Sequence, residues 1–215
     1  FKEKDSVFIT KRAVAITVRD NDSIYVHADT LRITGKADNR ILRGYYKARF
    51  FKKGLPGEEP TSGKCDSIYV NEKTGITKLL RKPILWTGEN QMTGDTIHLL
   101  RNIETSKLDT LKVFKNAFII QKDSAGYNQV KGERLIGLFT NNELDTINIE
   151  KNTQVIFFSR NEEQELVGIN NTISSSIQMY LEKQQTRGIR FNKKVNGKLY
   201  PPSQFPENAR VLPGF

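Results

Sequence analysis

A short motif recurs along the chain and constrains its fold more than any other feature. It reads Asp, then Ser or Thr, then two apolar residues separated by one residue, and the pentapeptide DSIYV occurs twice, at 22–26 and 66–70. Successive strand side chains point to opposite faces, so the two apolar positions share a face. Asp, Ser and Thr suit the turn before a strand, where they bond to backbone groups. Each copy therefore predicts a turn and then a half-buried strand. The copies begin at Asp5, Asp22, Asp29, Asp66, Asp95, Asp109 and Asp145, with a relaxed copy at Ser175.

Strand-like runs fill almost the whole chain, and no 3.6-residue periodicity lasts long enough to predict a helix. The intervals between motif copies are 17, 7, 37, 29, 14 and 36 residues, which does not support the fixed rung length of a β-helix. The sequence therefore predicts an all-β fold, a twisted antiparallel β-jelly roll in which two sheets face each other. The sixteen expected strands are 6–10, 13–19, 23–33, 44–51, 66–70, 76–80, 84–86, 95–100, 109–114, 117–121, 134–139, 145–149, 154–158, 166–169, 175–181 and 187–191.

Two segments differ from the rest in composition. Lys52–Lys64 is the clearest loop, because its glycines and prolines block strand pairing. Four of the seven prolines follow Tyr200. We expect a jelly roll over 1–199 and a Pro-rich extended tail or linker over 200–215. Since the sequence opens on Phe1 rather than Met, we also expect it to be part of a longer protein.

Composition limits the classes of partner. Hydrophobic residues make up 37% of the chain, which is lean for a thick core and suits a thin two-layer β structure. The formal net charge of +10 favours an anionic partner such as nucleic acid, an anionic membrane surface or a phosphorylated glycolipid. Cys65 is the single cysteine, so no disulfide forms within the chain. No stretch approaches the roughly 18 apolar residues that cross a bilayer as a helix.

The residue types that carry chemistry are scattered. Seven repeated aspartates indicate a structural position rather than a catalytic pair. His27 and His98 lack a His or Cys partner at metal-ligand spacing, and we interpret them as exposed strand residues. Cys65 has no recognisable nucleophile context. We therefore expect no enzyme activity, no metal and no cofactor.

Basic residues cluster in two segments. Seven lie within Lys36–Lys53 and six within Lys183–Lys198. Such runs are often only solvated faces, and the alternative is an anionic ligand held near them. The strand 44–51 alternates aromatic and basic residues, but it departs from the RNA-recognition signature and the helices of that fold are missing. Nucleic-acid binding is therefore not expected.

Several segments resemble a known family. They are Ala28-Asp29-Thr30-Leu31, the strand 44–51, Lys82–Trp86 and Gly88–Ile97, together with Gly197–Pro202 and Leu212–Phe215. In these the chain resembles the OstA-like branch of the LptA family, in the form found in Bacteroidetes-type bacteria. The Lys52–Lys64 loop and the details of charge depart from the family pattern.

The resemblance implies a periplasmic jelly roll, open at both ends, that is associated with the outer membrane. Members carry lipopolysaccharide from the inner to the outer membrane and shield its acyl chains in an apolar groove. The expected partners are lipopolysaccharide, through its lipid A, and other lipopolysaccharide-transport proteins or further copies joined through edge strands, with peripheral contact with membrane components and no nucleic acid. The domain could equally be the bridging protein or the matching domain of the outer-membrane partner.

The apolar positions of the motif supply the expected groove lining. Cationic side chains are expected to hold the anionic head group. The expected lipid-binding residues are Ile24, Val26, Leu31, Ile33, Ile68, Val70, Ile97, Leu99, Leu111, Val113, Phe118, Ile120, Ile147, Ile149, Ile156, Phe158, Ile177 and Met179, and the expected head-group contacts are Arg43, Lys47, Arg49, Arg187 and Arg190. Side chains that only pack on each other as a closed core are the other interpretation.

Two other functions rank below the transport module, the β-solenoid second and the nucleic-acid-binding module third. A structural or polysaccharide-binding β-solenoid of the cell envelope would show exposed aromatic rows instead of an apolar interior. A nucleic-acid-binding module would lose affinity steeply with added salt.

Overall fold

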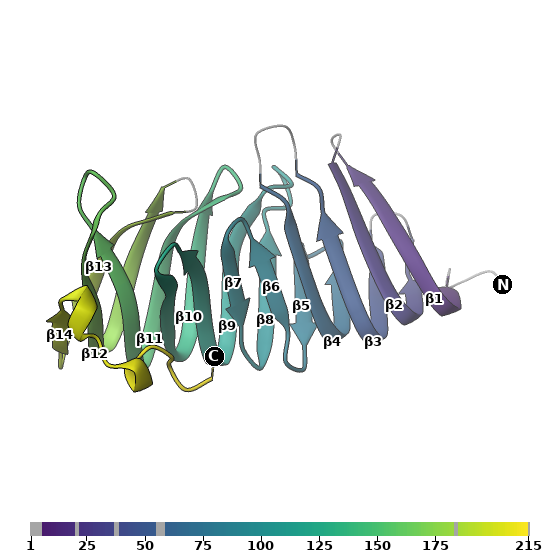
Figure 1. Cartoon of the computed structure of the whole chain (residues 1–215). Helices are drawn as coiled ribbons and strands as arrows, with labels where there is room; N and C mark the ends of the chain where they lie inside the picture. The colour runs from purple at the N-terminus through teal and green to yellow at the C-terminus, as the bar shows by residue number, and fades with distance from the viewer. Residues whose placement is uncertain (1–5, 20–21, 37–38, 55–58, 183–184, 215) are drawn as a thin grey trace.

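The computed structural model describes residues 6–19, 22–36, 39–54, 59–182 and 185–214 (Figure 1). Within these ranges the chain forms fourteen strands of one antiparallel sheet and two short 3-10 turns, without an α-helix. The strands are β1 (Ser6–Arg19), β2 (Asp22–Thr34), β3 (Ile41–Lys52), β4 (Thr61–Asn71), β5 (Ile76–Leu80), β6 (Ile84–Thr87), β7 (Asn90–Thr93), β8 (Thr96–Arg101), β9 (Leu108–Asp123), β10 (Gly126–Thr140), β11 (Glu143–Arg160), β12 (Leu166–Glu182), β13 (Gln185–Asn192) and β14 (Asn196–Tyr200), and the 3-10 turns are η2 (Pro202–Gln204) and η3 (Glu207–Ala209).

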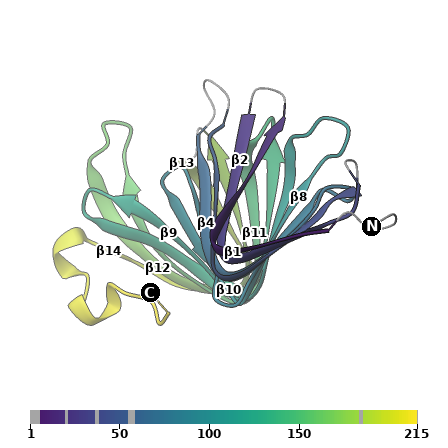
Figure 2. The ribbon, with the colours of Figure 1, turned by 90° about the vertical axis from the view of Figure 1, so that its right-hand side faces the viewer.

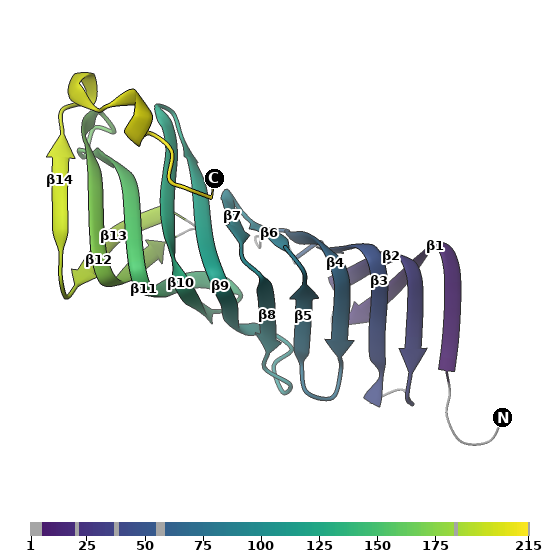
Figure 3. The ribbon, with the colours of Figure 1, turned by 90° about the horizontal axis from the view of Figure 1, so that it is seen from below.

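The sheet is folded along a line across its strands, so that two arms face each other. Seen end-on, it has the shape of a V (Figure 2), and the strands follow one another along its length (Figure 3). One arm contains β5, β8 and β13, and we call it the β8 arm; the other contains β6, β7 and β14, and we call it the β14 arm. The long strands β1–β4 and β9–β12 contribute a half to each arm. We call one crossing of the chain from one arm to the other a pass. Each long strand is one pass, and β5–β6, β7–β8 and β13–β14 are each the two halves of one pass, so the sheet has eleven bent passes.

The line of folding, which we call the crease, is made by pairs of residues in the left-handed backbone region. These pairs have φ between 48° and 66° and occur on every odd pass. The register of strand pairing shifts at several of them. Left-handed backbone costs a non-glycine residue roughly 1–2 kcal/mol, so the bend is maintained by the packing of the arms. The pairs are Lys11–Arg12, Tyr46–Lys47, Arg81–Lys82, Lys115–Asn116, Lys151–Asn152 and Lys193–Lys194.

Small side chains line the inner angle of the crease. A Cβ atom on Gly132 would lie 2.5 Å from Ile149 Cγ2, closer than carbon atoms approach. A Cβ atom on Gly94 would lie 2.3 Å from Val113 Cγ1. The two arms therefore meet at the crease only because little volume stands between them. The buried residues at this angle are Ala13, Ala28, Ala48, Cys65, Ala117, Thr153 and Ser174.

The outer side of the crease alternates in charge. Three even passes carry Asp29, Asp66 and Asp95 there, whereas β12 carries Ser175. Arg81 Nη1 lies 2.7 Å from Asp66 Oδ2. Lys47 Nζ lies 3.6 Å from Asp29 Oδ2. The hydrogen bond from Ser67, followed by that from Arg81, lowers the pKa of Asp66. Exposed pairs of this kind contribute little individually, but they neutralise neighbouring passes.

The repeated Asp-Ser/Thr motif therefore occupies two kinds of position. Asp22 opens β2, and Asp109 and Asp145 lie near the starts of β9 and β11, close to the predicted turn position. Asp29, Asp66 and Asp95 lie at the crease instead. Asp29 and Asp66 stand inside the continuous strands β2 and β4, so the predicted turn is wrong for these two, whereas Asp95 lies at a bend directly before β8, as predicted. Asp5 lies outside the described residues.

The main core fills the angle between the arms. Directly paired residues of successive strands form continuous aliphatic rows across the inner face. One row of the β8 arm runs through Leu31, Gly44, Ile68, Leu79, Ile97, Val113, Leu135, Ile149 and Ile177. Except for Gly44, each of these is a large apolar residue with at most 2% of its surface exposed. Burying one such side chain contributes roughly 1.5–3 kcal/mol, so these rows hold the V together.

A second, smaller core lies on the outer face of the β14 arm and is covered by the C-terminal segment. Phe205 and Leu212 are buried there, 4% and 3% exposed. Gln129 clamps the segment at two points, because its Nε2 donates to the Arg210 carbonyl at 2.8 Å and its Oε1 accepts from the Leu212 amide at 2.8 Å. The segment predicted to be extended thus contains two 3-10 turns and packs on the sheet. The division of the chain at 199 stays a prediction.

Strand by strand, the all-β prediction is confirmed and its segmentation is corrected. Four pairs of predicted strands are single bent strands, β1, β9, β11 and β12, because a left-handed pair or a bulge bends a strand without ending it. β7 and β14 were not predicted. The predicted turn at Asn170–Asn171 is wrong, since both residues pair within β12. In the predicted Lys52–Lys64 loop, β4 already begins at Thr61, and 55–58 lie outside the described residues. One folded sheet takes the place of the expected two.

Candidate binding groove

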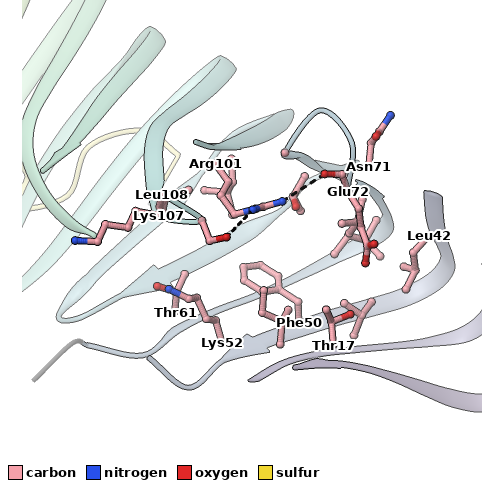
Figure 4. Close-up of a pocket in the computed structure, with 18 of the residues that line it drawn as sticks. Thr17, Leu42, Phe50, Lys52, Thr61, Asn71, Glu72, Arg101, Lys107 and Leu108 are labelled. Atoms are coloured by element: carbon pink, nitrogen blue, oxygen red, sulfur yellow. Dashed lines mark hydrogen bonds between the residues drawn. The ribbon is translucent and has the colours of Figure 1, made fainter. Parts of the chain in front are cut away.

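An open groove lies between the arms in the N-terminal half of the V. It has a cavity volume of about 220 Å³ and is lined by β1–β5, β8, the start of β9 and the loops beside them (Figure 4). Its floor is apolar, and the floor side chains are buried or half-buried. The apolar floor residues are Ile24, Val26, Leu42, Phe50, Ile68, Val70, Leu99 and Leu108.

Cationic side chains from both arms stand at the rim. Lys52 lies on the β14 arm, and Arg101 and Lys107 lie on the β8 side (Figure 4). Arg101 is held in place, since Nη1 donates to Ser106 Oγ at 3.2 Å and Nη2 to the Glu72 carbonyl at 3.4 Å. Lys107 Nζ donates to Asn141 Oδ1 at 3.2 Å.

Two carboxylates, Glu59 and Glu72, share the rim with these cations. The arrangement can hold a molecule with an apolar part and an anionic end, because apolar floor and cationic rim lie in one groove. The cationic excess at the rim is small, so charge orients such a ligand more than it binds it.

The groove closes towards the C-terminal half. There, Thr186 Oγ1 of the β8 arm lies 3.5 Å from Gln121 Oε1 of the β14 arm. Thr87, Asn90 and Gln121 form directly paired neighbours on the inner face, and they are only 4%, 2% and 7% exposed. Polar side chains therefore cross the trough where the open groove ends.

The eighteen predicted lining residues fall into three groups. Ile24, Val26, Ile68, Val70 and Leu99 line the groove. Four lie on the outer face of the β14 arm against the C-terminal segment, so the inner-face prediction is wrong for Phe118, Ile120, Ile156 and Phe158. The remaining nine pack in the core between the arms or at its N-terminal margin, namely Leu31, Ile33, Ile97, Leu111, Val113, Ile147, Ile149, Ile177 and Met179. Contact of any of them with lipid stays a prediction.

Parity explains the misplaced group. A left-handed crease pair takes up two residues, so the inner face continues on every second residue through the bend. In β9, Ala117 and Ile119 therefore follow Val113 on the inner face, and Phe118 faces outward. In the prediction the two halves of β9, and likewise of β11, were separate strands, so the alternation of inner and outer residues was not carried across the crease. Leu42 and Phe50 were missed as lining residues, although Leu42 pairs directly with Ile33 and Val70.

The five predicted head-group residues do not line the groove. Arg43 lies over the Tyr69 ring, 5.4 Å from Cζ to the ring centre, and Lys47 pairs with Asp29 at the crease. Arg49 is exposed between the inward-facing Ala48 and Phe50. Arg187 pairs with Glu182, and Arg190 is exposed. The cations that the fold brings to the groove are Lys52, Arg101 and Lys107.

Reactive groups are buried or dispersed in the part of the chain that the structure describes. Burial raises the pKa of the Cys65 thiol to about 11, and its Sγ donates to the Ser67 carbonyl at 3.1 Å. Both histidines are half-buried instead of exposed. His98 packs edge-on against Phe114, and burial lowers its pKa. His27 Nδ1 lies 3.1 Å from the Ala13 carbonyl. Over the described ranges, no three His, Cys, Asp or Glu side chains gather at a site that could hold a metal ion.

Comparison with known proteins identifies the fold. No protein-family model matches the sequence, and a search of curated proteins found no match. Among solved structures, the chain is similar to LptH, the LptA-homologous periplasmic component of the lipopolysaccharide transport device of Pseudomonas aeruginosa. The TM-score is 0.52 at 15% sequence identity, over 66% of this chain and 96% of LptH.

The V-shaped sheet is therefore a β-jelly roll of the LptA type, as the sequence predicted. No helix within the described residues is long and apolar enough to span a membrane.

Proposed function

We propose that this chain is a periplasmic lipopolysaccharide-binding and transport module, associated with the outer membrane, that shields acyl chains in the groove between its arms. The observation that carries the proposal is an open trough with an aliphatic floor and cations on both rims. The similarity of the fold to LptH supports it. The proposal assigns no reaction and no cofactor to the chain.

Apolar contact supplies most of the affinity. Each buried methylene contributes roughly 0.8 kcal/mol, whereas a basic residue near an anionic lipid contributes only about 1 kcal/mol. A dozen methylenes therefore outweigh the three rim cations by several-fold. A cavity of about 220 Å³ is smaller than the roughly 300–1,000 Å³ of a typical small-molecule pocket, so it holds segments of acyl chains while the head group stays outside.

The rim cations give a direct test of how much the charge at the groove contributes to binding. The double variant Lys52→Gln/Lys107→Gln is expected to weaken binding of bis-phosphorylated lipid A by roughly 10- to 30-fold at low salt. The matched control Arg43→Gln/Arg49→Gln removes the same charge from the outer face and is expected to change it little. Equal losses in both variants would show that only net charge matters.

The edges of the sheet suit end-to-end association into a bridge between membranes. β1 leaves one backbone edge open, and Phe8 and Ile16 on it are 68% and 60% exposed. β13 and β14 form the opposite edge. Because the number of antiparallel passes is odd, both edges run in the same direction, so a head-to-tail stack would join copies, or sister domains, through parallel pairing.

Mass spectrometry of the protein purified from its native envelope tests the function as a whole. Co-purified lipid A is the expected result. Its absence, together with failure of added lipid A to bind the purified protein, would contradict the proposal.

Polysaccharide binding is the second candidate, because aromatic residues are exposed on the outer face of β2 and β3. Tyr25 and Phe51 pair directly, with ring centres 6.3 Å apart, and both are more than a third exposed. A Tyr25→Ala/Phe51→Ala variant would lose retention on an envelope polysaccharide if this candidate is right, and would keep lipid A binding if the first is right.

A further inference from the structure

The trough is not uniform along its length. The open groove ends at β4, the start of β9 and Asn142. Beyond it, the β14 arm presents the polar neighbours Thr87, Asn90 and Gln121, and Gln121 meets Thr186 from the opposite arm. We call these four residues the polar seam.

Burial distinguishes the seam from the rest of its row. The same inner row of the β14 arm begins with Thr17 and Ile24 and continues through Lys52 and Thr61 at the open groove, where it is half-exposed. At Thr87, Asn90 and Gln121 the exposed fraction falls below a tenth. These polar side chains are unfavourable neighbours for an acyl chain in the trough, because an inserted chain would take away their hydrogen-bond partners or water.

Apolar inner surface resumes beyond the seam. Phe157 on β11 packs against the main core, and Leu181 on the facing arm is 8% exposed. The seam therefore lies between the open groove, which we call the N-terminal compartment, and the packed apolar side chains around Phe157 and Leu181, which we call the C-terminal compartment.

We propose that the polar seam limits bound acyl chains to the N-terminal compartment of the trough, and that a lipid reaches the C-terminal compartment only when Gln121 and Thr186 separate. This inference rests on the proposed lipid-binding function. It assigns Gln121 and Thr186 as residues that determine how far along the trough a chain extends.

Photo-crosslinking at two matched aromatic positions tests it. p-Benzoylphenylalanine replaces Phe50 in the open groove or Phe157 beyond the seam, and each protein is irradiated with radiolabelled lipid A. In the otherwise native chain we expect crosslinking at 50 to exceed that at 157 by about tenfold or more, since one position lies in the open groove and the other beyond a closed contact. In Gln121→Ala/Thr186→Ala we expect the yield at 157 to rise several-fold while the yield at 50 is unchanged.

The control variant is Thr146→Ala/Gln154→Ala, which makes the same two substitutions on the outer face. It is expected to leave both yields unchanged. Circular dichroism checks folding, and Thr186→Ala alone replaces the double variant if that variant unfolds.

Equal crosslinking yields at 50 and 157 in the native chain would overturn the inference, as would an unchanged yield at 157 in the folded alanine variant of Gln121 and Thr186 or of Thr186 alone. No crosslinking at either position would contradict the lipid-binding function itself, so the two failures are distinguishable.

Discussion

Leu42 offers the sharpest test of the groove, because it is apolar, half-buried and on the groove floor without being part of the fully buried core. Leu42→Asp places a carboxylate where an acyl chain would lie (Figure 4). Ile97 and Ile147 are unsuitable for the same change, since both are completely buried and a carboxylate there would endanger the fold.

The expected loss of affinity follows from contact area. A leucine on the floor meets about three or four methylenes of a chain, each contributing roughly 0.8 kcal/mol. Losing them costs about 2.4–3.2 kcal/mol, which is roughly a 60- to 200-fold weaker Kd. Since Leu42 is half-buried, the fold is expected to lose only about 1–2 kcal/mol. For a chain of this size, that lowers Tm by roughly 2–8 °C.

Titration of lipid A against the purified variant, followed by tryptophan fluorescence or calorimetry, measures the change. The control is Leu138→Asp, because Leu138 is 42% exposed and faces outward from β10. The control is expected to bind as the native chain does. Native affinity in folded Leu42→Asp would refute the argument, as would an equal loss in Leu138→Asp.

Three further predictions concern the crease, a partly buried ion pair and the open edge. Lys151→Gly relieves left-handed strain at φ 63° and is expected to raise Tm by a few degrees in calorimetry, whereas Lys122→Gly within β9 should lower it; the reverse order would contradict strain at the crease. Asp123 accepts two bonds from Arg160, at 2.7 and 3.0 Å, and these hold its pKa below the ordinary 3.8. The stabilisation from the ionised Asp123 is therefore present above pH 3.8 and is lost as the pH falls through the lower pKa of the folded state. Asp123→Asn should have a smaller free energy of unfolding than the native chain at neutral pH, and the two values should converge in acid. A difference in free energy of unfolding that stays constant with pH in denaturant titrations would be inconsistent with this. Phe8→Lys on the β1 edge should reduce self-association in concentration-dependent light scattering, and a native chain that stays strictly monomeric would remove the edge contact for this fragment.

Much of the fold could be predicted from residue pattern. The alternation in copies such as Asp66–Val70 and Asp95–Leu99 indicates half-buried strands wherever it occurs, and all-β architecture follows from its spread along the chain. The candidate site could be predicted from the sequence only in part. Lys52, Arg101 and Lys107 have no shared sequence pattern and come together only because the two arms face each other.

The two copies of DSIYV separate the contributions of sequence and tertiary structure. In each, the sequence alone determined that Ile and Val share a buried face, because strand side chains alternate. Only the tertiary structure decided that one copy opens a strand at Asp22 while the other bends a strand at Asp66. It also decided that Phe118 and Ile156 face the C-terminal segment while Val113 and Ile149 face the trough. The physical reason is that alternation specifies two faces of a strand, while the crease and the returning C-terminal segment, made by residues distant in sequence, decide what covers each face.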